Sequence, residues 1–140
     1  MKASLAAGVT ATSTLVVDRD RTICFMGEKA RVYATPMLVR DIEMACRDLL
    51  LQNLDPGEDS VSTRVELDHL AATLLGMRVE LTVTVASILG RTVTFEVSGR
   101  DTLDLICKGR HARFPHPVVD GPFTQASLKA LWLARRVPGV

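Results

Sequence analysis

Two side chains with complementary acid–base chemistry, Glu43 and His69, fall on the apolar sides of neighbouring predicted elements. Residues 61–69 alternate in polarity as a strand does, and His69 lies on the same side as Val61, the side expected to meet the helix. Glu43 borders the apolar arc of a predicted helix, beside Val39. Burial raises the pKa of a carboxyl and lowers that of an imidazole, so this pair suits proton transfer near neutral pH. Taken alone, each residue more readily fits a structural role. His69 would be a hydrogen-bonded histidine of the core, and Glu43 would form a salt bridge at the edge of the apolar face.

The balance of residue types is typical of one folded domain. The 140 residues have a mass of 15.3 kDa, within the usual size of a single domain. Hydrophobic residues make up 47% and charged residues 24%, which excludes a disordered chain. The 17 Lys and Arg against 16 Asp and Glu leave a net charge of +1, so we expect no nucleic-acid partner. No apolar stretch approaches the ~20 residues of a membrane-spanning helix, so we expect no membrane partner.

The three cysteines are Cys24, Cys46 and Cys107, widely spaced and without a Cys-x-x-Cys pair. Their odd number and spacing fit neither a zinc site nor a disulfide framework. We therefore expect no metal and a reducing, cytoplasmic location.

One long helix and five strands must position the acid–base pair. The helix is predicted over residues 36–51, with Thr35 as its N-cap and Pro36 in its first turn. Clusters of β-branched residues and alternation of period two predict strands over residues 13–17, 61–69, 78–85, 92–97 and 102–114. A short helix is predicted over residues 124–135.

The order of these elements predicts an α+β fold. Consecutive strands form an antiparallel meander, in which Gly90 supplies a hairpin turn and Gly109 marks a bulge or a close backbone approach. Clean alternation leaves one face of a five-stranded sheet for the helix to cover. We expect one domain over residues 1–140, with a core at about 12–114 and a C-terminal extension over 115–140.

The predicted helix is apolar on two sides. Besides its main apolar arc, Met37, Met44 and Leu51 form a second stripe at intervals of seven residues. Either a partner chain covers this stripe, or it is a partly exposed row of methionines.

Five short runs, taken together in this order and spacing, resemble the hot-dog-fold acyl-CoA thioesterases, and within them the fluoroacetyl-CoA thioesterase-like branch. The runs are VYATPM (32–37), IEMAC (42–46), LDPGE (54–58), LDHLAAT (67–73) and GRHAR (109–113). The resemblance implies a strongly curved antiparallel sheet wrapped around one long helix. It also implies a homodimer, or a dimer of dimers, with composite active sites at the interface.

The resemblance further implies a thioester hydrolase whose catalytic residues are Thr35, Glu43 and His69. Glu43 would act as a general base on water or as a nucleophile that forms a transient anhydride. His69 would move protons, and Thr35 would hydrogen-bond Glu43 or the substrate carbonyl, or serve only as a helix cap. Backbone N–H groups near the helix start are natural donors to the developing oxyanion.

Binding residues are also implied by the resemblance. Arg113, and after it Arg110, would meet the phosphates of coenzyme A, or would merely form a solvated strand end. His111 would pack or hydrogen-bond within the sheet. Ser62 stands where a glycine is expected beside the acyl pocket. No cofactor is expected beyond the coenzyme A thioester that is the substrate.

Departures from the branch set the expected substrate. The segment 24–33 is shorter than the hydrophobic lid of the fluoroacetyl-specific members and carries Glu28, Lys29 and Arg31. Because discrimination of fluoroacetyl depends on a well-fitted pocket, a short or medium acyl or aryl thioester is the expected substrate class. The alternative is a non-catalytic acyl-CoA-binding or regulatory module on the same fold. A hydratase or dehydratase ranks last, because no Asp and His pair lies near the helix entry.

Overall fold

The computed structural model describes residues 1–134. In chain order its elements are β1 (Thr10–Val16), the 3-10 turn η1 (Arg19–Arg21), β2 (Thr22–Ile23), the 3-10 turn η2 (Glu28–Ala30), β3 (Val32–Tyr33), α1 (Thr35–Leu51), β4 (Glu58–His69), β5 (Arg78–Leu89), β6 (Thr92–Arg100), β7 (Leu105–Pro117) and α2 (Gln125–Ala134). The predicted α+β fold is confirmed, and the final predicted position of the second helix, Arg135, lies outside the described residues.

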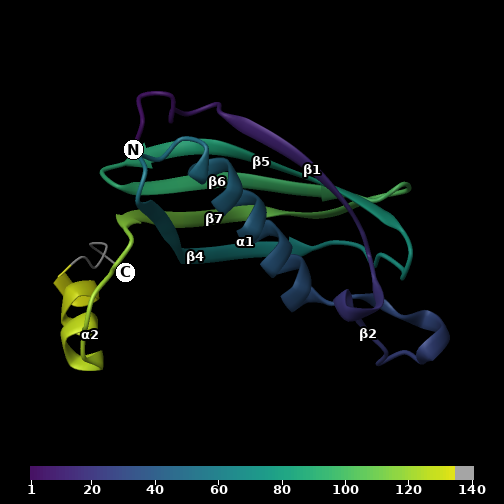
Figure 1. Cartoon of the computed structure of the whole chain (residues 1–140). Helices are drawn as coiled ribbons and strands as arrows, with labels where there is room; N and C mark the ends of the chain where they lie inside the picture. The colour runs from purple at the N-terminus through teal and green to yellow at the C-terminus, as the bar shows by residue number, and fades with distance from the viewer. Residues whose placement is uncertain (135–140) are drawn as a thin grey trace.

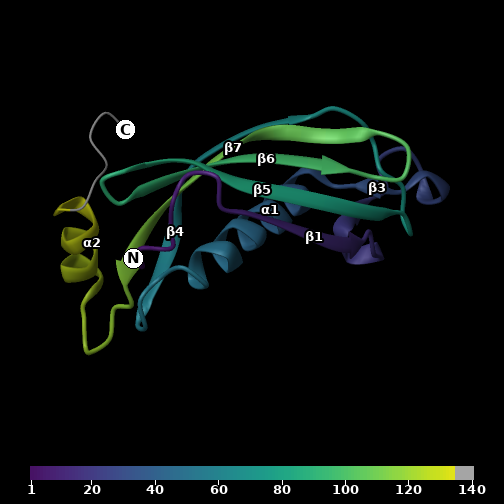
Figure 2. The same cartoon turned by 90° about the horizontal axis from the view of Figure 1, so that it is seen from above.

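The five long strands form one antiparallel sheet in the order β1-β5-β6-β7-β4. The sheet curves around α1, which lies diagonally across its concave face (Figure 1). Seen from above, the helix runs under the sheet, and α2 lies at one end (Figure 2), where the ring centroids of Trp132 and of His116 on β7 are 4.9 Å apart. This is the hot-dog arrangement that the resemblance implied, with β1 and β4 at the two edges.

The core lies between the concave face of the sheet and α1. The predicted alternation is confirmed in β5 and β6, whose inward side chains are buried: Val79, Leu81, Val83, Val85, Val93, Phe95 and Val97. Leu38, Ile42 and Cys46 of α1 meet them, at the four-residue spacing that places side chains on one helix face. Each large side chain buried in this way contributes about 1.5–3 kcal/mol.

The residues of the second apolar stripe of α1 differ in their burial. Met37 packs against the core, whereas Met44 and Leu51 remain 41% and 38% exposed. Met44 lines a hollow between α1 and β1, with Ala11 and Val83. The prediction that a partner covers this stripe stays a prediction.

The start of α1 corrects one expectation. Ala34, not Thr35, is the N-cap residue, and it makes no side-chain capping bond. The Ala34 carbonyl accepts the first helical hydrogen bond from Leu38, at 3.0 Å. Thr35 is therefore the first helical residue, and its hydroxyl is left to bond elsewhere.

A bulge in β4 corrects a second expectation. Register with β7 shifts between Ser62 and Arg64, so Thr63 is an extra residue in the strand. Because successive side chains alternate, the inserted residue reverses which face the earlier positions occupy. Ser62 thus turns toward α1, and Val61, predicted to face the helix, is 43% exposed.

Gly109 makes the close backbone approach that its place in a strand predicted. A Cβ at this position would lie 2.0 Å from the carbonyl oxygen of Glu66 on β4, which no real side chain tolerates. Glycine therefore lets β7 and β4 come together beside the region where His69 emerges.

A buried polar network ties the segment before α1 to the helix. Asp41 of α1, with a side chain only 9% exposed, accepts a short hydrogen bond from the Tyr33 hydroxyl. It also accepts two hydrogen bonds from Arg21, at 2.8 and 3.1 Å. Burial, with the Asp41 hydrogen bond, raises the pKa of Tyr33 well above its usual value. The network fixes the approach of the chain to Thr35.

We expect Asp41→Asn to lower the free energy of unfolding by about 2–3 kcal/mol, because it removes the buried carboxylate that accepts two hydrogen bonds from Arg21 and leaves that cation paired with the exposed Asp18. Urea unfolding followed by circular dichroism measures the change. Asp48→Asn, which removes the same charge from an exposed position of α1, is the matched control. Equal effects of the two substitutions would contradict a role for the network.

No helix within residues 1–134 is long and apolar enough to cross a membrane. Over the same residues, no three His, Cys, Asp or Glu side chains gather closely enough to hold a metal ion.

Candidate active site

The seam between α1 and β4 holds two clusters of polar side chains. The first joins the first turn of α1 to the last residue of β4: the Thr35 hydroxyl lies 2.7 Å from Nδ1 of His69. The other ring nitrogen, Nε2, is buried and has no hydrogen-bond partner within the described chain. Burial lowers the pKa of His69, so its ring is neutral at pH 7. A neutral imidazole with one unused nitrogen is equipped to exchange a proton.

The second cluster centres on Glu43, midway along α1. Ser62 of β4, placed here by the bulge, donates a hydrogen bond of 2.8 Å to Oε1 of this carboxylate. The hydrogen bond from Ser62 and the positive charge of Arg113 lower the pKa of Glu43. The carboxylate is thus ionised at neutral pH, and its side chain remains 42% exposed.

Arg113 lies beneath that carboxylate rather than at the surface. Its side chain is 3% exposed. Its guanidinium donates to both Ser60 oxygens, at 2.7 and 2.9 Å, and to Ser62 Oγ at 3.1 Å. The expectation that Arg113 meets coenzyme A phosphates, or forms a solvated strand end, is therefore corrected: the group is buried and its donors are occupied inside the chain.

His111 belongs to the same cluster. Its Nε2 lies 3.2 Å from Nη1 of Arg113 and 3.3 Å from Ser62 Oγ. Burial first, then the charge of Arg113, lower the pKa of His111 to about 4, so the ring is neutral. Because a guanidinium only donates, Nε2 must be the accepting nitrogen. Sequence reasoning had His111 pack or hydrogen-bond within the sheet, but it did not link His111 to Glu43. The GRHAR run contained a signal for its contact with Arg113, since residues two apart on a strand share a face.

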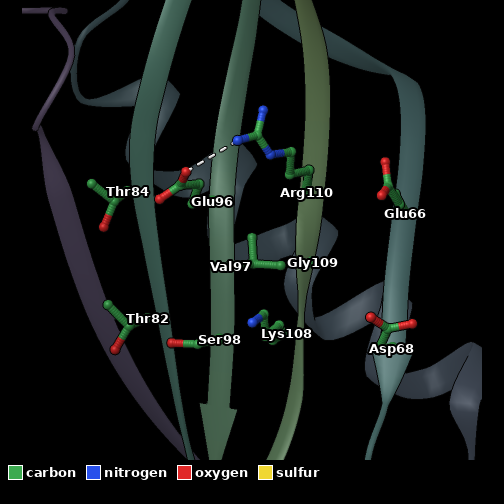
Figure 3. A pocket seen from close by; sticks show the side chains of 10 residues that line it. All are labelled: Glu66, Asp68, Thr82, Thr84, Glu96, Val97, Ser98, Lys108, Gly109 and Arg110. Carbon is green, nitrogen blue, oxygen red and sulfur yellow. Dashed lines mark hydrogen bonds and ion pairs between the residues drawn. The ribbon is translucent and has the colours of Figure 1, made fainter.

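Arg110 lies on the opposite face of the sheet. Its guanidinium is 3.3 Å from Glu96, and its side chain is 58% exposed. It lines a hollow of about 550 Å³ on the outer face of the sheet. Figure 3 shows it there among polar side chains that project from β4, β5, β6 and β7. The structure therefore does not bring Arg110 together with Glu43 or His69, and its predicted contact with the phosphates of coenzyme A stays a prediction.

The two clusters are separate within one chain. Thr35 and Glu43 are eight residues apart on α1, a rise of about 12 Å. Ser62 and His69, their partners, are likewise at different points along β4. One substrate atom therefore cannot contact both the Thr35–His69 pair and Glu43 of the same chain.

The side of β4 away from β7 carries no strand in the sheet of residues 1–134. This edge is long, at 12 residues, and it carries two apolar side chains, Val61 and Val65, that are 43% and 50% exposed. An unprotected edge of this length is a natural template for pairing with another strand.

The model of the family described as fluoroacetyl-CoA-specific thioesterase (FlK) matches residues 17–118. A curated relative, the fluoroacetyl-CoA thioesterase of Streptantibioticus cattleyicolor, is 32% identical over 120 residues, which is 81% of this chain and 86% of the relative.

Solved structures of thioesterases have a similar fold over most of the chain. A Thermus thermophilus protein described as a thioesterase superfamily member has a TM-score of 0.76 at 31% identity, over 95% of this chain and 94% of its own. A mutant of the fluoroacetyl-CoA-specific thioesterase FlK, in complex with fluoroacetate and CoA, has a TM-score of 0.75 at 30% identity, over 81% of this chain and 97% of its own. The family match over residues 17–118 includes both clusters on the α1–β4 seam.

Proposed function

Because the chain belongs to the family of fluoroacetyl-CoA-specific thioesterases and is a thioester hydrolase that acts on acyl-CoA, we propose that Thr35, Glu43 and His69 form its catalytic site. The observation that carries this proposal is the 2.7 Å contact between Thr35 and His69, on the same seam as the ionised Glu43. These residues supply a hydroxyl, a neutral imidazole and a carboxylate, the groups that acyl transfer to water requires.

The reaction joins a water oxygen to the thioester carbonyl carbon and breaks the carbon–sulfur bond. Glu43 either takes the proton from the attacking water or attacks the carbonyl itself and forms a mixed anhydride that water then opens. In the general-base route, the proton that Glu43 takes from water passes to Nε2 of His69 and from there to the departing thiolate, which returns the imidazole to its neutral form. In the anhydride route the thiolate leaves first, and the proton that His69 passes to it comes from the water that opens the anhydride. The first turn of α1 places positive partial charge near the developing oxyanion. Trapping of an acyl-enzyme at Glu43 by hydroxylamine distinguishes the nucleophilic route from the general-base route.

We propose that each site takes Thr35 and His69 from one protomer and Glu43 from its partner. Two observations support this: the rise of about 12 Å between Thr35 and Glu43 on one helix, and the unpaired edge of β4. Antiparallel pairing of two β4 edges about a two-fold axis sets the start of one strand beside the end of the other. That places the Glu43 and Ser62 of one chain toward the His69 of the other, and it covers Val61 and Val65.

The proposed substrate is a short or medium acyl, or aryl, ester of coenzyme A. The curated relative is a fluoroacetyl-CoA thioesterase, but the segment before α1 departs from the fluoroacetyl-specific pattern through Glu28 and Arg31, which pair with one another at 2.9 Å. The proposed hydrolysis needs water and the thioester, and no further cofactor.

Thiol release by the wild-type protein tests this function. The panel runs from acetyl-CoA and fluoroacetyl-CoA to medium-chain and benzoyl-CoA, with binding measured in parallel by calorimetry. We expect turnover of at least one class well above the uncatalysed rate, with kcat/KM naming the class. Binding of the esters without turnover would contradict the proposal and point instead to a ligand-binding module.

A further inference from the structure

The guanidinium of Arg113 is a buried charge whose counter-charge is the carboxylate that the proposed mechanism uses. Its side chain is 3% exposed, and its head group is surrounded by Ser60, Ser62, His111 and Glu43. An unpaired buried cation is strongly disfavoured, whereas one held by several hydrogen bonds and a carboxylate is stable. The arrangement therefore stabilises the ionised form of Glu43 over the protonated one.

The two carboxylate oxygens of Glu43 have different hydrogen-bond partners. Oε1 accepts hydrogen bonds from Ser62 Oγ at 2.8 Å and from Arg113 Nη1 at 3.4 Å. Oε2 has no hydrogen-bond partner among residues 1–134. One oxygen is thus tied to β4 and β7, and the other remains available on the partly exposed side of the residue.

We propose that Arg113 is a positioning residue: it fixes Glu43 as an oriented anion with Oε1 occupied, so that Oε2 is the oxygen that meets water or the thioester carbonyl. This inference rests on the proposed role of Glu43. In this proposal Arg113 orients Glu43 and does not bind the phosphates of coenzyme A. His111 serves the arrangement by remaining neutral and accepting from Nη1, so that it adds no competing charge.

Other ionisable groups near the pair do not take over this task. They are Asp59 of β4, and Cys46 and Arg47 of α1. Asp59 and Arg47 bind one another, at 2.7 and 3.0 Å, so their opposite charges largely cancel at Glu43. Burial raises the pKa of Cys46 to about 12, so its thiol is uncharged. Arg113 is therefore the cation that governs Glu43 within the described chain.

The test compares Arg113→Met with Arg113→Lys, and with Lys108→Met as the matched control. Lys108 lies on the outer face of the same strand, so its substitution removes one charge without touching the cluster. We expect Arg113→Met to lower kcat by roughly 10²-fold, the cost of a misplaced reacting group. Arg113→Lys, which keeps the charge but not the fork of donors, should recover part of that loss. Lys108→Met should keep the wild-type rate.

A readout independent of turnover is the pKa of the Glu43 carboxyl, followed by ¹³C NMR and assigned by the signal missing from Glu43→Gln. In the wild type this pKa lies below the usual carboxyl value. We expect it to rise in Arg113→Met and to stay low in Arg113→Lys. If Arg113→Met does not fold, Arg113→Lys and Ser60→Ala, which removes the acceptor of Arg113 Nε, provide the same two measurements.

The outcomes separate the two proposals. If Glu43→Gln abolishes turnover but Arg113→Met keeps both the wild-type rate and the wild-type Glu43 pKa, the positioning role is wrong and the catalytic site stands. If Glu43→Gln keeps full turnover, the proposed role of Glu43 is wrong. Loss of stability in Arg113→Met with no change of the Glu43 pKa would show a purely structural residue and overturn the inference.

Discussion

Glu43→Gln is expected to lower kcat for the preferred acyl-CoA by about 10³-fold, within the range that a positioned base or nucleophile contributes. The amide keeps the shape of the side chain and can still accept the hydrogen bond from Ser62. It lacks the negative charge that attacks a carbonyl carbon or takes a proton from water. Thiol release measured under saturating substrate gives kcat directly, and KM should change much less than kcat because the substitution preserves shape.

Two controls make the loss interpretable. Glu66→Gln removes the same charge from an exposed position of β4, where Glu66 pairs with Arg64 on the surface. It should retain the wild-type rate. Thermal unfolding and gel filtration of Glu43→Gln should show the wild-type fold and assembly. A folded Glu43→Gln variant with undiminished turnover would remove Glu43 from the mechanism.

The mixing of two inactive variants, Glu43→Ala and His69→Ala, is expected to restore activity. If Thr35 and His69 of one chain work with Glu43 of the other, each mixed dimer contains one site with no lesion. Random exchange of equal amounts makes half of the dimers mixed, so activity should recover to about one quarter of the wild type. The measurement is thiol release after the two variants are unfolded together and refolded.

The competing geometry predicts a different number. If each site uses three residues of a single chain, every site in the mixture carries a lesion, and no activity returns. Mixing Thr35→Val with His69→Ala is the internal control, because both lesions then fall on the same half of the site. That mixture should stay inactive under the proposed arrangement, since any mixed dimer has a damaged Thr35–His69 pair at each site.

The residue pattern by itself predicted the long helix and the five strands of the main sheet, and it pointed to Glu43 and His69 as an acid–base pair. Alternation of period two identified the inward side chains of β5 and β6, because hydrophobic residues must face the core wherever one face of a sheet is covered. Gly109 was recognised because a glycine inside a strand signals close approach of another backbone. The resemblance assigned Thr35, Glu43 and His69, and the structure brings two of them, Thr35 and His69, into contact.

Only the tertiary structure decided which faces and partners these residues have. The inserted Thr63 reverses the first half of β4, turning Ser62 toward Glu43 and Val61 away. The burial of Arg113 depends on Ser60 and Ser62, more than 50 positions earlier in the chain. A local pattern gives the period of one element, but it contains neither the register between strands nor the residue at which that register slips. Those depend on how the whole sheet closes around α1, and they decide whether an arginine meets solvent or a carboxylate.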